Sequence, residues 1–167
     1  MVQGAMVVTI CNRIPQEPYY CLSEWSKSLR GIRPVILGSL SGEYNGLASK
    51  PKLVYKAIKQ GLIDSKYVIF CDCWDLVFAS ELSELLETFF VFNSPFVISA
   101  ERNCFPSDLK EQYDTLPFTS SFKYLNSGMI VAETEAMLTV LEAMDLDNVP
   151  DDHYDTELNQ MVHHPRS

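Results

Sequence analysis

Short runs of apolar and β-branched residues alternate along the chain with longer segments whose apolar residues recur at helical spacing. The short runs have the length and composition of buried strands, and the longer segments predict helices. Strands that alternate with helices are typical of an α/β sandwich with a largely parallel central sheet. The expected strands cover residues 6–10, 34–37, 67–71, 96–100 and 129–132. The expected helices are 18–29, one that begins at Pro51 and ends before Gly61, one capped by Ser80, 134–144 and a short one over 155–162.

Two of these helices carry specific signals. Ser80 is a residue type that caps the amino terminus of a helix, and Glu81 and Glu84 follow it in the first turns. Trp25 and Phe89 lie at helical spacing among other apolar residues, so both are expected in the core.

Length and charge narrow the class of protein. The chain has 167 residues, 47% of them hydrophobic, which suits one domain over residues 1–167 and is too few for two. The formal charge of -9 argues against a nucleic-acid partner, which would need clustered positive charge. An acidic balance is compatible with an enzyme that holds a divalent cation and so shields an anionic substrate.

The cysteines and the apolar runs predict a cytoplasmic protein without a membrane partner. The five cysteines include no Cys-x-x-Cys pair, so zinc is not expected, and the Cys71-x-Cys73 spacing is poorly suited to a disulfide. We therefore expect reduced, mostly buried thiols. The apolar run over residues 5–11 lacks a basic leader, and no run approaches the roughly 18 apolar residues of a membrane span.

Two carboxylates follow the third expected strand. Asp72 and Asp75 come directly after the apolar run YVIFC, and open α/β sheets bind ligands at the carboxyl ends of their strands. Carboxylate oxygens are hard ligands that suit Mg²⁺ or Mn²⁺, and such ions bind diphosphates. The two acids converge only if the chain turns after the strand. The alternative is that they merely solvate the end of a strand.

Three further segments place polar groups near predicted elements. Ser99-Ala100-Glu101 ends the next strand with a carboxylate, and Asn126-Ser127-Gly128 places an amide, a hydroxyl and a permissive glycine just before the last strand. Asp151 and Asp152 begin an acidic cluster after the last long helix.

The order of four segments resembles one family. The segments FCDCWD, SAERNCFP, YLNSGMIVA and DDHYD follow one another over about residues 66–160. They resemble the glycosyltransferase domain of multifunctional procollagen lysyl hydroxylases, and they are similar to related procollagen glycosyltransferase-like proteins. The resemblance implies a GT-A fold of the Rossmann type, a UDP-sugar donor and Mn²⁺. It also implies transfer of glucose or galactose to hydroxylysine or to a galactosyl group.

The resemblance implies roles on the donor side. Asp72 and Asp75 match the Asp-x-aromatic-Asp pattern and would hold the metal, and Trp74 would stack on or border the uridine. Thr9 matches a position that contacts the nucleotide base, and Lys50 matches a lysine that approaches the diphosphate.

On the acceptor side, Asn126 matches the asparagine of the LNSG motif, and Asp151 and Asp152 match an acidic run near the sugar and the acceptor. One of these two aspartates is expected to deprotonate the acceptor hydroxyl. Glu101 is expected either to orient the acceptor or to cap a loop.

Two departures from the family bear on activity. Phe105 stands where the family has a tryptophan, so we expect a different gate over the donor. The family's third metal ligand is a histidine in a C-terminal HGNG-like segment, relative to which this chain reads as short. His163 and His164 lie too close to Asp155 to match that segment and are expected to be surface residues. We therefore expect UDP to bind, with slow turnover by this chain alone.

Two other functions stay open. A GT-A module without its third metal ligand can bind a nucleotide sugar or a glycan without turnover. A haloacid-dehalogenase-like phosphatase also carries acids at the end of an apolar strand, but it needs Asp-x-Asp on its first strand. Here Asp72 and Asp75 are three positions apart and follow a later strand.

Overall fold

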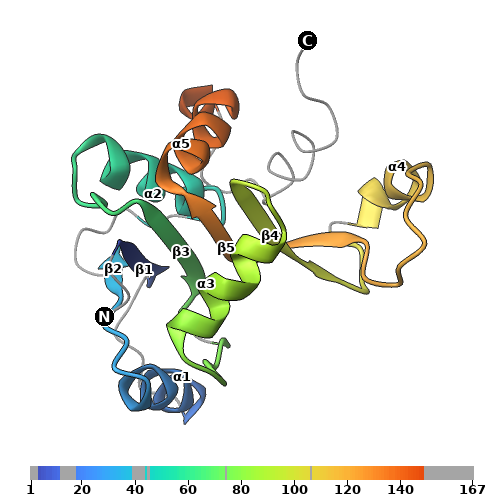
Figure 1. Cartoon of the computed structure of the whole chain (residues 1–167). Helices are drawn as coiled ribbons and strands as arrows, with labels where there is room; N and C mark the ends of the chain where they lie inside the picture. Colours follow the sequence, from blue (N-terminus) through green and yellow to red (C-terminus); the bar gives the residue numbers. More distant parts are fainter. Residues whose placement is uncertain are drawn as a thin grey trace.

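A five-stranded sheet with helices on both faces forms the body of the protein (Figure 1). The computed structural model describes residues 4–11, 18–38, 44, 46–73, 75–105 and 107–148. The strands are β1 (Ala5–Ile10), β2 (Val35–Leu37), β3 (Tyr67–Asp72), β4 (Phe96–Glu101) and β5 (Tyr124–Glu133), in the spatial order β2-β1-β3-β5-β4. β1 pairs in parallel with β2 and β3, whereas β5 is antiparallel to both β3 and β4. Four strands therefore point the same way, which confirms the predicted α/β class and mostly parallel sheet.

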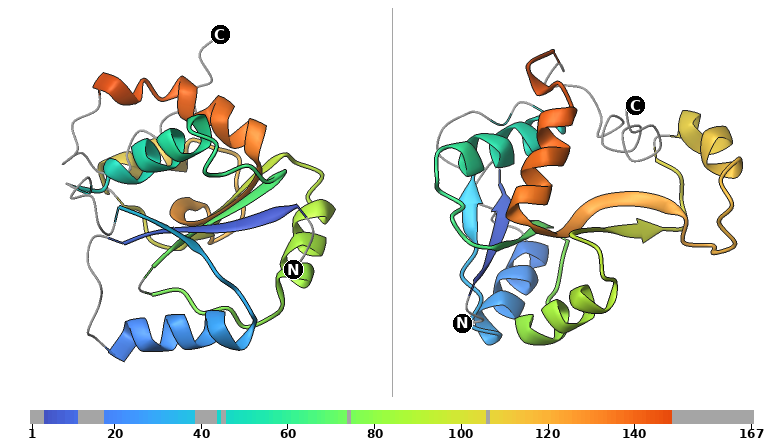
Figure 2. Two further views of the ribbon diagram at one scale, coloured as in Figure 1. Left: turned by 90° about the vertical axis from the view of Figure 1, so that its left-hand side faces the viewer. Right: turned by 45° about the horizontal axis from the view of Figure 1, so that its top comes forward.

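The helices divide between the two faces of the sheet. They are α1 (Pro18–Leu29), α2 (Ser49–Lys59), α3 (Leu82–Val91), α4 (Lys110–Asp114) and α5 (Thr134–Ala143), with two short 3-10 helices, η1 (Ser107–Leu109) and η2 (Leu146–Asn148). α2 and α5 cover one face, and α1 and α3 lie on the other (Figure 2). No helix within the described ranges is long and apolar enough to cross a membrane. The helix predicted over residues 155–162 lies outside them.

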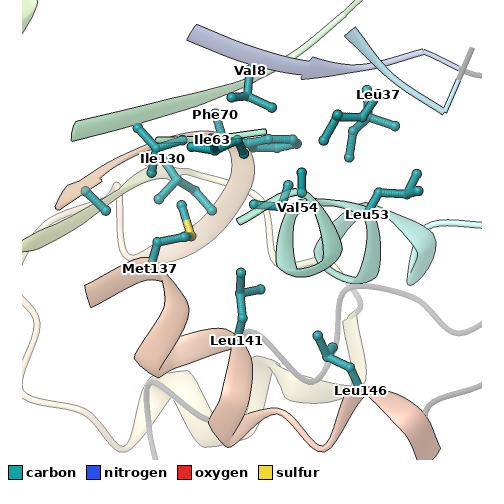
Figure 3. Packing of buried hydrophobic residues seen from close by; sticks show 14 of the residues in the cluster. Val8, Leu37, Leu53, Val54, Ile63, Phe70, Ile130, Met137, Leu141 and Leu146 are labelled. Atoms are coloured by element: carbon teal, nitrogen blue, oxygen red, sulfur yellow. The ribbon is translucent and has the colours of Figure 1, made fainter. Parts of the chain in front are cut away.

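The larger core lies between the sheet and the helices α2 and α5. Val8 and Phe70 project from β1 and β3 toward this side, where they meet Val54 of α2 and Leu141 of α5 (Figure 3). All four side chains are buried. Burying a side chain of this size stabilises the fold by about 1.5–3 kcal/mol, so this packing fixes α2 against the end of β3.

The opposite face of the sheet packs on α3. Ile69 of β3 and Val131 of β5 contact the cluster that contains Leu86 and Phe89 of α3. Phe89 is buried, as predicted. Trp25 of α1, by contrast, is 60% exposed, so the prediction that it lies in the core is wrong. Among the α1 side chains that the structure describes, Ser23, Ser26 and Lys27 are the buried ones, and each contacts a main-chain group beyond β3.

The start of α3 differs from the prediction by one residue. The residue before the helix is Glu81, which has an extended backbone and makes no side-chain capping hydrogen bond. Its carboxylate accepts a hydrogen bond of 2.9 Å from Arg30 Nη1, so it is turned toward α1. The prediction that Ser80 caps this helix is wrong.

β5 is longer than predicted and contains a bulge. Ile98 of β4 pairs with Ile130, whereas the next residue, Ser99, pairs with Asn126. Three residues of β5, 127–129, therefore have no counterpart on β4. Asn126, Ser127 and Gly128 lie inside the strand rather than before it, which corrects the predicted start at residue 129.

The segment between β4 and β5 forms a lobe that projects from the sheet (Figure 2). Residues 102–123 make up this lobe, which includes η1 and α4. It has its own small core of Leu109, Tyr113 and Tyr124. Asp114 accepts hydrogen bonds from Lys110 at 2.7 Å and from Lys123 at 2.6 Å, which ties α4 to the chain that enters β5.

Candidate active site at the carboxyl ends of the strands

Several predicted residues meet at the edge of the sheet where β1, β3 and β4 end and β5 begins. Asp72 is the last residue of the central strand β3, and the four residues before it are buried. Its own side chain is half-buried at 29% exposure. The strand thus presents one carboxylate at the edge where open α/β sheets bind ligands.

Lys50 reaches this edge from the first turn of α2. Its Nζ lies 2.8 Å from Oδ1 of Asp72, and its side chain is 16% exposed. The apolar face of α2, which includes Leu53 and Val54, holds the helix on the sheet and so positions the lysine. Because both partners are partly shielded from water, their attraction exceeds that of a fully hydrated surface pair.

Gly128 lies against the same carboxylate because of the bulge in β5. A Cβ atom at this position would lie 2.7 Å from Oδ1 of Asn126 and 3.1 Å from Oδ2 of Asp72. The Gly128 N–H donates a 2.7 Å hydrogen bond to that same Asn126 oxygen. The close approach, rather than an unusual backbone angle, is what requires glycine here.

Asn126 links this glycine to Glu101. The Asn126 Nδ2 group donates to Oε1 of Glu101 at 3.0 Å, so both polar ends of the amide are used. The Ser99 hydroxyl donates to the Asn126 carbonyl at 2.7 Å and fixes the main chain at the bulge. Lys50, Asp72, Gly128, Asn126 and Glu101 therefore form a continuous polar row across the edge.

Hydrogen bonds from α1 hold the segment that follows β3 and carries Asp75. The Ser23 hydroxyl donates to the Leu76 carbonyl at 2.7 Å, and the Phe78 N–H donates to Oγ of Ser26 at 3.1 Å. Lys27 Nζ lies 3.1 Å from Oε1 of Glu24 and 3.5 Å from the Cys73 carbonyl, and its side chain is buried. These hydrogen bonds explain why the polar side chains of Ser23, Ser26 and Lys27 are buried.

The donor set at this edge suits a hard divalent cation. Asp72 offers a carboxylate whose Oδ1 atom is paired with the ammonium group of Lys50. Asp75 lies three residues further along the chain, and it is exposed. Within the described part of the chain, no three Asp, Glu, His or Cys side chains come together as a complete metal site. Two carboxylates would leave the other coordination positions to phosphate oxygens and water.

Thr9 does not face this edge. Its side chain is fully buried, and its hydroxyl donates a 2.8 Å hydrogen bond to the Cys71 carbonyl. The residue therefore fastens β1 to β3 inside the sheet. The contact with a nucleotide base that was expected at Thr9 stays a prediction.

Three thiols lie next to Thr9 and beneath the site. Cys11, Cys71 and Cys73 are buried, in line with the prediction of mostly buried thiols. Burial raises the pKa of Cys71 to about 11 and that of Cys73 to about 12, and a hydrogen bond with Cys11 adds to the rise for Cys73. Thiols held in this way are protonated at neutral pH.

Three predicted site residues, Trp74, Asp151 and Asp152, lie outside the described ranges. So do His163 and His164, which were expected at the surface. The roles of Trp74, Asp151 and Asp152 therefore stay predictions.

The structure adds positioning residues that the sequence analysis did not identify. Ser99 fixes Asn126, and Ser23 and Ser26 fix the chain around Asp75. Isolated serines carry no distinctive sequence signal. The length of β5 could have been inferred from the run YLNSGMIVA, which continues apolar on both sides of its polar centre.

Comparison with known proteins identifies the family. A search of curated proteins found no match. The family model of the PLOD GT domain matches residues 37–158. This range includes every residue of the polar row, and it includes both Asp72 and Asp75. The match covers more than half of the chain, and it confirms the resemblance to the glycosyltransferase domain of procollagen lysyl hydroxylases. The chain belongs to the PLOD glycosyltransferase domain family.

Proposed function

We propose that this glycosyltransferase domain transfers a hexose from a UDP-sugar to an acceptor hydroxyl, with Mn²⁺ or Mg²⁺ held by Asp72 and Asp75. Family membership supports the reaction class. The observation that carries the proposal for this chain is the meeting of Lys50 and Asp72 at the end of the central strand. A carboxylate beside a lysine, at a strand end, can receive both a cation and a diphosphate.

The donor diphosphate would lie between Lys50 and the two aspartates. Lys50 would contact its oxygens as a positive point charge, since an ammonium group binds phosphate well. A bound divalent cation would supply Lewis-acid stabilisation of the departing UDP. Trp74, between the aspartates in the chain, would border the uridine.

The acceptor would approach from the side of Glu101 and Asn126. Positive charge develops at the anomeric carbon as UDP leaves, and a nearby carboxylate such as Glu101 can stabilise it. The 3.0 Å hydrogen bond from Asn126 holds Glu101 in place for this role. Asp151 or Asp152 would take the proton of the acceptor hydroxyl. Hydroxylysine and a galactosyl group are the acceptors that we propose.

A transfer assay tests this function. The chain is incubated with Mn²⁺, UDP-glucose or UDP-galactose, and a collagen-like peptide that carries hydroxylysine or galactosylhydroxylysine. We expect UDP release coupled to a peptide heavier by one hexose. We expect Glu101→Gln to lower kcat far more than it changes UDP affinity, because Glu101 acts on the sugar side. Absence of a glycosylated product with every donor and acceptor would contradict the proposal.

The second candidate function is a module that binds a nucleotide sugar or a glycan without turnover. The observation that favours it is that the described residues hold no complete three-ligand metal site. This function predicts UDP-sugar binding by calorimetry together with no detectable donor hydrolysis. Hydrolysis or transfer that is abolished by Asp72→Asn would favour the enzyme instead.

A further inference from the structure

The first residues of β5 have a strand beside them on one side only. β3 pairs with β5 from Met129 onward, whereas residues 124–126, beyond the bulge, pair with β4 alone. Among the described residues, no strand pairs with the other edge of this stretch. The stretch nevertheless carries Asn126 and pairs with the end of β4, where Glu101 lies. Main-chain groups along an unpaired edge need other partners, so something outside the sheet has to fix this part of β5.

The lobe between β4 and β5 supplies such a partner. The Leu125 N–H donates a 3.3 Å hydrogen bond to the hydroxyl oxygen of Tyr113 in α4. Tyr113 is 2% exposed, and its ring meets that of Tyr124 edge to face with the centroids 5.2 Å apart. Leu109 belongs to the same small core. Because packing holds the ring, the hydroxyl oxygen has a fixed place beside β5.

The position of Leu125 determines the geometry of the next residue. The Asn126 side chain accepts a 2.7 Å hydrogen bond from the Gly128 N–H and donates a 3.0 Å hydrogen bond to Glu101. Both bonds depend on where the main chain of β5 lies, since the asparagine side chain has only two torsion angles with which to adjust. A shift of the main chain at Leu125 would therefore disturb the link between Asn126 and Glu101.

We propose that Tyr113 is a positioning residue for the acceptor side of the site, which holds Asn126 and Glu101 in place through Leu125. The lobe is then a working part of the site. This inference rests on the proposed function, in which Glu101 stabilises charge at the anomeric carbon. Because a misplacement of about 1 Å can cost roughly 100-fold in rate, loss of this one hydrogen bond should lower kcat on the order of 10-fold.

The first arm of the test needs no turnover. The variant Tyr113→Phe keeps the buried ring and removes only the hydroxyl. Amide hydrogen exchange and the side-chain amide signals of Asn126 are followed by NMR in the variant and in the parent chain. We expect the Leu125 amide to exchange about 10-fold faster in the variant, because its acceptor is lost, and the Asn126 signals to shift. Tyr55→Phe, which removes a hydroxyl from α2, is the matched control and should change neither.

The second arm measures transfer and nucleotide binding. With Mn²⁺, a UDP-sugar and a hydroxylysine peptide, Tyr113→Phe should show the lower kcat, and its Kd for UDP should stay within about twofold of the parent value. The Kd is expected to hold because Lys50 and Asp72 belong to α2 and β3, which Tyr113 does not support. A role in stability alone would lower the Tm and leave the kcat of the folded variant unchanged. Tyr55→Phe should keep both kcat and Kd.

Three results would overturn the proposal. One is that Tyr113→Phe leaves the Leu125 exchange and the Asn126 signals as in the parent. Another is that its kcat is unchanged, or that its Kd for UDP rises as much as its kcat falls. The third is read from the parent chain, even if the variant unfolds, and it is a Leu125 amide that exchanges as fast as that of the exposed Thr119. A parent chain that transfers no sugar would contradict the proposed function, and the NMR arm alone would then decide whether Tyr113 holds Asn126.

Discussion

The ammonium group of Lys50 lies 2.8 Å from Oδ1 of Asp72, and this contact joins the first turn of α2 to the end of the central strand. The pair is partly open to water, so it contributes only about 1 kcal/mol or less to stability. Its importance lies in position, because it brings a fixed positive charge to the edge where the motif begins.

Replacing Lys50 by methionine should weaken UDP binding much more than it weakens the fold. A charge-assisted hydrogen bond to a phosphate is worth about 1.5–3 kcal/mol, so the affinity should fall roughly 10–100-fold. The Tm should change by only a few degrees. Lys50→Arg keeps the charge and serves as the matched control. Calorimetry measures both affinities, and an unchanged Kd for Lys50→Met would remove Lys50 from the donor site.

Gly128→Ala should disturb the site through a steric clash. The added Cβ would lie 2.7 Å from Asn126 Oδ1, a contact that something must relieve by moving. We expect a loss of about 1–3 kcal/mol in stability and weaker UDP binding. Gly61→Ala is the control, since Gly61 has a positive φ of 71° but nothing within 4 Å of the added atom.

The two glycine variants distinguish backbone strain, which Gly61→Ala introduces, from a steric clash at the site, which Gly128→Ala introduces. Both should lower the Tm in thermal unfolding followed by circular dichroism. Only Gly128→Ala should lower UDP affinity. Equal affinities for the two variants would show that the bulge in β5 has no part in nucleotide binding.

Ser26→Ala should loosen the chain around Asp75. The substitution leaves the buried Phe78 N–H without its acceptor, which costs about 1–3 kcal/mol. We expect a lower Tm and a weaker metal dependence of UDP binding. Ser28→Ala, at an exposed position of the same helix, should change neither. If the Ser26→Ala variant bound UDP with unaltered affinity and metal dependence, α1 would contribute to the fold but not to the site.

The lobe should respond to acid through Asp114. Hydrogen bonds from Lys110 and Lys123 lower the pKa of Asp114 from its ordinary value of 3.8. A carboxyl group whose pKa is lowered on folding contributes stability above its unfolded pKa, and this contribution is lost as the pH falls through the folded pKa. We expect α4 to become sensitive to an acid-active protease in that range, below about pH 4.

Asp114→Asn should remove this pH dependence, because the amide does not titrate. A carboxyl titration by NMR checks the direction of the shift in the parent chain. An Asp114 pKa at or above its ordinary value would contradict the role assigned to the two lysines.

The strands and most helices were predictable from the sequence because their side chains enter an apolar core. The residues around Ile69 form a continuous apolar run, which predicts a strand buried on both faces. The structure places this run in β3, where residues 68–71 are buried. Asp72 and Lys50 were likewise predicted, as a strand-end acid and a lysine of the family pattern.

The failures occur where polar groups replace apolar ones in packing. Trp25 was expected in the core because it is large and apolar, yet α1 turns Ser23 and Ser26 inward, where main-chain groups are their partners. The start of β5 was missed because Asn126 and Gly128 interrupt its apolar pattern. Asn126 bonds to Glu101 of β4, and Gly128 lies against Asp72 of β3. Such contacts depend on the tertiary fold and leave no periodic signal in the sequence.

The most direct test of the account is calorimetry of UDP binding with Mn²⁺ and with EDTA, on the parent chain, Asp72→Asn and Asp64→Asn. Asp64 is exposed and precedes the opposite end of β3, so its variant makes the same charge change away from the site. We expect the parent and Asp64→Asn to bind UDP in Mn²⁺ and to lose most of that affinity in EDTA. Asp72→Asn should bind weakly in both conditions, with a Tm within a few degrees of the parent. Equal UDP affinity of the parent chain in Mn²⁺ and in EDTA would contradict the metal-dependent site at the end of β3.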